Sequence, residues 1–484
     1  MDTAERKMRR VTIGVIVSAW SMLSAACGPE SPNTADLVLS NATIVDVEAG
    51  ELIPGRTIFI EDARIVDIIS ASRAVVPEGA QEVDATGLHV IPGLWDAHVH
   101  SATSLAWHFP LLVAHGVTSV RNMHTTVDTA IELITAIKRR VEAGEVIGPR
   151  FLANGPILDG YPPAWPGAVV VRTASEGRAV VDSLSAAGAD FIKVYDNLTP
   201  ETYHAIAQQA KQRGIPLDGH VPILVTAEEA AAAGQRTTEH MTGINLGCSA
   251  RSDSVRSLFR DLLEDLPSLS FPDNAVAVFT LIRAASDSRD PALCDKTVRS
   301  YVEAGVSAVP TLAIEDVDPS QLIADSGRMD LLPAGVREQW VDMAAAGPGP
   351  IDAVWIGAEW TSPVNTRLLH EAGVPILAGT DLGNPFLVPG LSLHDELALL
   401  VREAGLSPLE ALRAATLNPA RTFGLADSLG TVAPGRLADL VLLVGNPLED
   451  ITQVSRIAGV VLRGRYLSRV VLDSLLAKGA AITN

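Results

Sequence analysis

The chain of 484 residues lacks the features that mark several classes of protein. It has only three cysteines, which excludes cysteine-rich zinc modules and small disulfide-stapled folds. It has 37 Lys and Arg against 57 Asp and Glu, which gives a formal net charge of −20. The surplus of basic residues expected of a nucleic-acid-binding protein is therefore absent. The sequence contains neither a G-x-x-x-x-G-K-[ST] phosphate loop nor a G-x-S-x-G nucleophile elbow. Since 47% of the residues are hydrophobic, the chain can bury a large core.

Residues 1–27 have the pattern of a bacterial export signal. Four basic residues, of which Lys7, Arg9 and Arg10 form the positive n-region, precede the apolar run Val11–Ala26, which is short for a membrane span. The segment Leu23–Cys27 resembles a lipobox in which Leu lies one position further from Cys than usual. We expect a lipid on Cys27, with plain signal cleavage or an uncleaved anchor as alternatives, and a linker over 28–35. The chain is then exported across the inner membrane to the periplasm or cell envelope and meets the membrane only through its anchor.

The two remaining cysteines, Cys248 and Cys294, flank a helical insertion expected over 249–300. If Cys27 is lipidated, they are an even pair in an oxidising compartment. A disulfide between them is therefore predicted, and two buried thiols are the alternative.

The hydrophobic pattern divides the rest of the chain into two parts. Residues 36–92 and 422–475 contain short apolar runs separated by Gly and Pro turns, which predicts antiparallel strands. In 93–421, strand-like runs alternate with helical ones, which predicts a parallel sheet. One expected strand ends at His100, and seven more are expected over Val117–Asn122, Phe151–Gly155, Phe191–Tyr195, Ile215–His220, Thr237–His240, Val306–Leu312 and Ile376–Asp381. We predict an α/β fold, a (β/α)₈ TIM-like barrel with a small composite β-sandwich domain built from both chain ends.

Residues that bind metals cluster at the ends of these strands. His98 and His100 lie two positions apart on one strand, so their imidazoles point the same way, as a divalent cation requires. Alone, such a pair is equally compatible with two structural histidines. The signal is stronger because other potential ligands lie at the ends of further strands, or within one: Lys193, His220, His240 and Asp381. In a barrel, the carboxyl ends of the strands face one pocket.

These motifs resemble those of the amidohydrolase superfamily. The resemblance rests on the segments Pro92–His100, Gly219-His220, Glu239-His240, Gly379–Asp381 and, near the C-terminus, Gly430–Val441. It is nearest to the imidazolonepropionase-like and metal-dependent dipeptidase-like branch.

The resemblance implies two divalent metal ions, most often zinc. His98, His100 and Asp381 would hold one ion, and His220 and His240 the other. Lys193, carboxylated by CO₂, would bridge both. A metal-bridging hydroxide would attack the scissile carbonyl, while Asp381 would act as catalytic base and then acid.

The expected reaction is hydrolysis of a C–N amide bond in a small molecule: a dipeptide, an N-acyl amino acid or a cyclic amide. Candidate substrate-binding residues are Tyr195, His394, Asn384 and His124. Lactone, ester or phosphotriester hydrolysis at the same metals is an alternative, and a catalytically inactive binding lipoprotein is another. The expected partner is a small-molecule substrate, and a homo-oligomer is compatible with the sequence.

Overall fold

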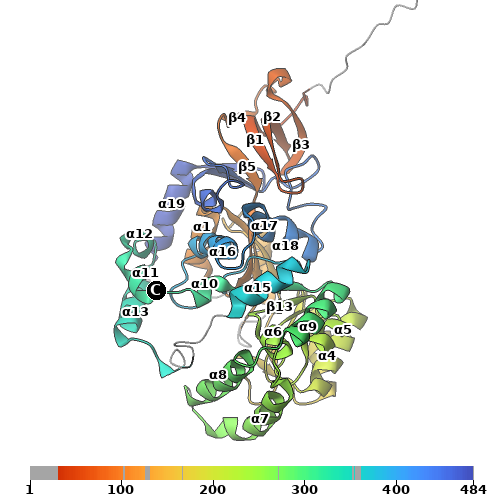
Figure 1. The fold of residues 1–484 in the computed structure, drawn as a ribbon. Helices are drawn as coiled ribbons and strands as arrows, with labels where there is room; N and C mark the ends of the chain where they lie inside the picture. Colours follow the sequence, from red (N-terminus) through yellow and green to blue (C-terminus); the bar gives the residue numbers. More distant parts are fainter. Residues whose placement is uncertain are drawn as a thin grey trace, which may run out of the picture.

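The computed structural model describes residues 31–101, 104–125, 131–165, 167–270, 272–350, 354 and 361–482. The predicted signal peptide and its lipidation site Cys27 lie outside these residues. Within the described part of the chain, no helix is long and apolar enough to cross a membrane. Figure 1 shows a sheet containing β1–β5 at one end of the molecule and helices α7 and α8 at the other.

Strands from both ends of the chain form one sheet. Its eight strands are β1 (Leu37–Asp46), β2 (Glu51–Glu61), β3 (Arg64–Ser70), β4 (Gln81–Asp84), β5 (His89–Pro92), β15 (Leu440–Leu443), β16 (Ile457–Leu462) and β17 (Arg465–Ser468). The order is β17-β16-β15-β5-β1-β2-β3, and β4 also pairs with β1. The two chain ends meet where Val441 of β15 lies antiparallel to Ile91 of β5. The predicted sandwich of two sheets and the domain boundaries stay predictions.

The expectation of antiparallel strands throughout 36–92 is wrong for two of them. β4 and β5 run parallel to β1, with Leu37 opposite Gln81 and Thr43 opposite His89. The hairpins β1–β2 and β2–β3 are antiparallel and occupy one side of β1. The chain then crosses back through residues 71–80 to the other side of β1, and a crossover of this kind produces parallel pairing.

The middle of the chain pairs its strands in parallel, as the alternating pattern predicts. These strands are β6 (Leu94–Val99), β7 (Val117–Asn122), β8 (Arg150–Ala153), β9 (Leu158–Asp159), β10 (Val169–Val170), β11 (Ile192–Val194), β12 (Leu217–Gly219), β13 (Thr237–Glu239) and β14 (Ser307–Val309). They form three groups, β6-β7-β8, β10-β9-β11-β12 and β13-β14. Isolated parallel bridges join Thr125 to Pro156, Leu217 to Gln235, Ala308 to Ile376 and Val99 to Leu382. The parallel pairing thus continues from group to group and returns to β6.

The strand predicted over Ile376–Asp381 is not continuous. Only isolated bridges at Ile376 and Leu382 mark its course. Leu377 N–H still donates to Ala308 O, and Asp381 N–H to His98 O. The regular ladder is interrupted where Ala378 N–H donates to Ala414 O and where Asp381 adopts a left-handed φ of 61°. This break sets the position of the Asp381 carboxylate.

Helices cover the parallel strands. They are α1 (Leu105–Ala114), α2 (Ile131–Glu142), α3 (Ala174–Ala186), α4 (Pro200–Arg213), α5 (Ala227–Ala232), α6 (Thr242–Gly247), α7 (Ser252–Asp265), α8 (Asp273–Ser286), α9 (Pro291–Ala304), α10 (Leu312–Glu315), α11 (Pro319–Ala324), α12 (Ser326–Met329), α13 (Ala334–Ala346), α15 (Thr361–Glu371), α16 (Leu391–Arg402), α17 (Pro408–Ala414), α18 (Leu417–Thr422) and α19 (Arg469–Ala480). The apolar sides of α7 and α8 pack on Ile223 and Leu246.

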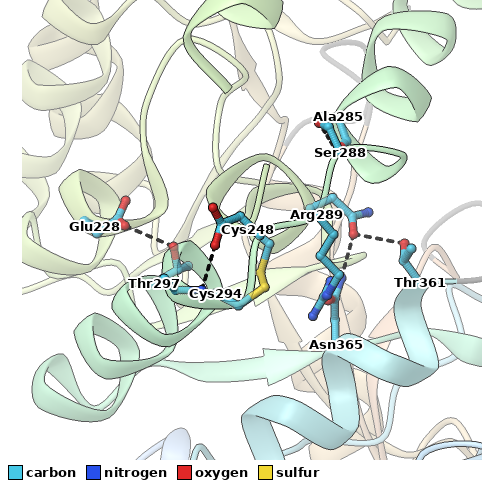
Figure 2. The surroundings of a disulfide bond; sticks show 12 residues. Glu228, Cys248, Ala285, Ser288, Arg289, Cys294, Thr297, Thr361 and Asn365 are labelled. Atoms are coloured by element: carbon cyan, nitrogen blue, oxygen red, sulfur yellow. Dashed lines mark hydrogen bonds between the residues drawn. A yellow bond between two sulfur atoms is a disulfide. The ribbon is translucent and has the colours of Figure 1, made fainter. Parts of the chain in front are cut away.

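A disulfide joins Cys248, at the end of α6, to Cys294 in α9 (Figure 2). Beside it, Asp290 N–H donates to Cys248 O at 2.7 Å, and the Thr297 hydroxyl donates to Glu228 at 3.0 Å. The crosslink therefore ties α9 to the short helix that follows His240.

Candidate metal centre

His98, His100 and Asp381 form the core of the site. His98 belongs to β6, His100 follows that strand, and Asp381 lies between the bridged residues Ile376 and Leu382. One potential ligand atom from each residue lies within 4.8 Å of the others. Asp381 Oδ1 is 3.2 Å from His98 Nε2 and 2.8 Å from His100 Nε2. Two imidazole nitrogens thus converge on one carboxylate oxygen, as the His-x-His spacing predicts.

The ionisation of this core reflects its burial. Desolvation lowers the pKa of His100 to about 4, so its imidazole is neutral near pH 7. Burial alone would raise the pKa of Asp381, but the neighbouring His98, His240 and His100 hold that pKa well below its usual range. A neutral imidazole beside a carboxylate is the combination of protonation states in which His and Asp bind metals.

His220 and His240 extend the core into a row of four imidazoles. Each follows a strand, His220 after β12 and His240 after β13. The ring centroids are 5.2 Å apart for His100 and His98, 4.7 Å for His98 and His240, and 4.8 Å for His240 and His220. We call these four residues the histidine row. All four were candidate ligands in the sequence, and the structure brings them together.

Each of three rings in the histidine row is held by a hydrogen bond at Nδ1. The partners are Glu239 Oε2 for His98 at 2.8 Å, Asp196 Oδ1 for His220 at 2.9 Å, and Thr311 Oγ1 for His240 at 2.8 Å. Sequence reasoning missed these three partners, because nothing in the pattern distinguishes them from other polar residues beside strand ends. Because Nδ1 of each ring is hydrogen-bonded, Nε2 is the ring nitrogen that remains to bind a ligand. His98 Nε2 and His220 Nε2 are buried and have no hydrogen-bond partner among the described residues.

Lys193 lies in the middle of β11, and its side chain is buried. Its Nζ is 5.5 Å from the ring centroid of Tyr195. No ion pair within the described residues includes Lys193. Burial lowers its pKa to about 8, although Glu239 and Asp381 oppose the shift.

Beside the row, Arg121 from β7 is fully buried in a network of ion pairs. Its guanidinium donates to Asp218 Oδ2 at 3.0 Å and to Glu239 Oε1 at 2.9 Å. It also donates to Thr237 Oγ1 at 2.9 Å and to Ala97 O at 2.7 Å. Arg121 thereby neutralises Glu239, and Glu239 in turn holds His98. This network was not predicted from the sequence.

The amidohydrolase family model matches residues 89–262 and 363–467, more than half of the chain. The chain belongs to the amidohydrolase family. The prediction made from the strand-end motifs, including the imidazolonepropionase-like branch, is confirmed. The predicted enzyme class is confirmed as well, a hydrolase acting on carbon–nitrogen bonds.

Named relatives and solved structures match most of this amidohydrolase. It is 27% identical over 421 residues to an imidazolonepropionase of Anaeromyxobacter dehalogenans, covering 84% of this chain and 90% of the relative. A putative prolidase from Bifidobacterium longum has 25% identity and a TM-score of 0.64, covering 93% of this chain and 100% of that one. An Xaa-Pro dipeptidase with bound methionine has 19% identity and a TM-score of 0.64, covering 89% and 99%. The structural likeness shows that they share the α/β fold.

Three of the four predicted substrate residues of this amidohydrolase lie beside the ligand candidates. The Tyr195 ring is 4.0 Å from that of His220, and Asn384 Nδ2 donates to Asp381 O at 2.9 Å. The His124 ring lies 5.9 Å from His100, edge-on.

His394 has different surroundings. It lies in α16, where its Nε2 bonds the backbone oxygen of His115 at 2.9 Å and its ring is 5.9 Å from the His115 ring. None of its contacts in the described part of the chain joins it to the histidine row. The structure therefore places it in the packing of α16 against the end of α1, not with the other three candidates.

Proposed function

We propose that this amidohydrolase is metal-dependent and hydrolyses the C–N amide bond of a small molecule such as a dipeptide, an N-acyl amino acid or a cyclic amide. The observation that carries the proposal is the histidine row, with its unpartnered ring nitrogens beside Asp381. A buried polar atom without a hydrogen-bond partner costs about 1–3 kcal/mol, so the open Nε2 atoms of His98 and His220 favour a ligand that offsets that cost. A cation that binds imidazole nitrogen and carboxylate oxygen would offset this cost.

The residues present fit two such ions. His98, His100 and Asp381 would hold one, and His220 and His240 the other. Zinc accepts this combination of nitrogen and oxygen ligands. The Nδ1 hydrogen bonds described above fix the ring orientation and tautomer that metal-binding histidines require.

Carboxylation of Lys193 by CO₂ is part of the proposal. A buried ammonium without an ionic partner is costly, and beside two cations it would also repel them. A carbamate removes both problems, because it carries negative charge and two oxygen ligands. The position of Lys193 in β11, near Tyr195 and the histidine row, supports this role.

Bound divalent ions at this site would polarise the scissile carbonyl and lower the pKa of water. The chain's own residues supply the proton transfers. Asp381 accepts a proton as the water oxygen bonds to the carbonyl carbon. It then delivers that proton to the amide nitrogen as the C–N bond breaks. Tyr195 and Asn384 flank the reacting group and position it.

The parallel pairings that return to β6, together with the shared fold, support a (β/α)₈ barrel. In such a barrel the carboxyl ends of all strands would open on one face, which brings the ligand candidates together. We further propose that the enzyme is exported and anchored in the cell envelope by a lipid on Cys27.

Hydrolysis of a lactone, an ester or a phosphotriester is the second candidate, because the same cation pair could polarise those bonds. The complete set of ligand candidates argues against an inactive binding protein. The names of the relatives, an imidazolonepropionase and dipeptidases, favour amide substrates.

The test is metal analysis followed by a substrate panel. Purified protein is stripped, reloaded with zinc in bicarbonate, and assayed on dipeptides, N-acyl amino acids, cyclic amides, lactones and phosphotriesters. About two zinc ions per chain and turnover of amides are expected. Fewer than one ion per chain overturns the two-metal site, and faster turnover of esters or phosphotriesters overturns the amide preference.

A further inference from the structure

We propose that a substrate subsite lies at the carboxyl ends of β7, β8 and β9. In it, the Asn154 side chain hydrogen-bonds a second amide of the substrate and the Trp165 indole packs against an apolar substituent. This inference rests on the proposed amide hydrolysis and names the substrate class: small peptide-like molecules with a large apolar side chain and an amide besides the one that is cleaved.

Asn154 is the first observation. It directly follows β8 and is 0% exposed, yet neither its Oδ1 nor its Nδ2 has a hydrogen-bond partner in the described structure. Buried side-chain amides are normally satisfied, because leaving one unpaired is costly. An Asn in this state is therefore explained by a partner that arrives from outside the chain.

The strand register indicates which way Asn154 faces. Leu152 of β8 lies opposite Arg121 of β7, so these two side chains share a face. Side chains alternate along a strand, so Asn154 is on the same face as Leu152, one layer closer to the strand ends. Arg121 reaches Glu239, which bonds His98, so this face is the one that carries the histidine row.

The loop 160–165 supplies the second observation, because it is firmly anchored. The Asp159 carboxylate accepts the N–H groups of Gly160 at 2.8 Å, Ala164 at 2.7 Å and Asn197 at 2.8 Å. The Asn197 side chain donates to Pro162 O at 2.7 Å. The loop is thus tied to Asp159, the last residue of β9, and to Asn197, which follows β11.

This anchoring holds an aromatic side chain beside the metal centre. Trp165 remains 44% exposed, while its Nε1 donates to His124 Nε2 at 2.9 Å. His124 lies edge-on to His100, whose side chain is 23% exposed whereas that of His98 is 0% exposed. The indole therefore borders the more accessible side of the centre. Thr125 N–H bonds Gly155 O at 3.0 Å, which places Asn154 next to the same segment.

The chemistry of the two groups defines the substrate. An Asn side chain offers one carbonyl acceptor and two N–H donors. Another amide satisfies both kinds, whereas a carboxylate uses only the donors. An exposed, oriented indole gains most from a large apolar or aromatic group. N-acetyl-L-phenylalaninamide contains both features and is the probe, with N-acetyl-L-alaninamide lacking the ring and N-acetyl-L-phenylalanine lacking the second amide.

The experiment compares zinc-loaded wild type with Asn154→Leu, Trp165→Ala and Trp165→Phe on these three probes. Asn154→Leu is expected to lower kcat/KM for N-acetyl-L-phenylalaninamide about 10- to 100-fold, mainly through KM, and to affect N-acetyl-L-phenylalanine less. Trp165→Ala is expected to remove the preference for the phenylalanine over the alanine probe, and Trp165→Phe to keep most of it.

Stability distinguishes binding from a structural role. Because Asn154→Leu removes an unpaired group, its Tm and zinc content should equal or exceed those of wild type. The matched control is Asn365→Leu. Asn365 is as buried as Asn154, but its side chain accepts a hydrogen bond from Arg289 at 2.5 Å (Figure 2) and donates one to Asn245 at 2.6 Å. The control substitution should therefore lower Tm.

The failures are distinguishable. Wild type that turns over none of the amides overturns the proposed function and this inference with it. Wild type that is active while Asn154→Leu keeps the wild-type selectivity, or loses Tm as the control does, overturns the subsite alone.

Discussion

Two adjoining layers of polar residues are both largely buried but differ in how their polar groups are satisfied. In the first, Arg121 is paired with Asp218 and Glu239, and each charge has a partner. In the second, the Nε2 atoms of His98 and His220 have no hydrogen-bond partner in the described chain. Burial alone therefore does not mark a functional site. The paired layer supports the fold, and the open layer is available to a ligand.

A substitution in the open layer is expected to have the largest effect, a loss of turnover. Asp381→Asn keeps the size of the side chain but removes the carboxylate that is proposed to accept and return the proton. We expect kcat to fall about 100- to 10,000-fold on the best amide substrate, because proton transfer by a positioned side chain contributes on that scale. Some zinc should remain bound, since His98 and His100 are unchanged. The measurement is steady-state turnover together with zinc content per chain.

The control for this variant is Asp84→Asn, which alters an exposed carboxylate in β4. It should leave both turnover and zinc content at the wild-type values. Turnover of Asp381→Asn near that of wild type would show that another residue moves the proton.

The paired layer should respond in stability. Arg121→Met keeps the length of the side chain but leaves Glu239 without its buried cation. Breaking a buried ion pair in this way costs about 3–5 kcal/mol, so the urea midpoint should fall sharply. The matched control is Arg469→Met, which breaks the exposed pair with Asp473 at 2.8 Å and should cost less than about 1 kcal/mol. Equal losses in the two variants would contradict the difference drawn between the layers.

The open layer could be predicted from the sequence to a large extent, and the paired layer could not. His98 and His100 are recognisable because a strand aligns residues two apart, and His220, His240 and Asp381 because they follow strand-like runs. The network of Arg121 depends on which strands become neighbours across the fold, and no local pattern encodes that register. For the same reason Asn154 could not be recognised from the sequence, because what distinguishes it is the lack of a hydrogen-bond partner and not its residue type.

The errors also have physical causes. Ile376–Asp381 begins with apolar residues like a strand, but the hydrogen bond from Ala378 N–H to Ala414 O and the positive φ of Asp381 interrupt the strand ladder. His394 follows the last strand region as expected and its Nε2 bonds the backbone oxygen of His115, so its role in substrate binding stays a prediction.

The smallest expected effect concerns the hydrogen bonds that orient the open layer. In the wild type, His220 Nδ1 lies 2.9 Å from a carboxylate oxygen of Asp196. Asp196→Asn keeps an oxygen at this position but removes the negative charge of the side chain. A neutral partner makes the imidazole a weaker ligand, so affinity for the zinc ion proposed at His220 should fall about tenfold, within the 10- to 100-fold range of such changes. Competition with a zinc chelator measures it, and urea unfolding of the metal-free protein should show little change, because Asp196 is not in contact with Arg121. Weaker binding of both ions to the same extent would instead mean that the site responds as one unit and that the layers are not separable.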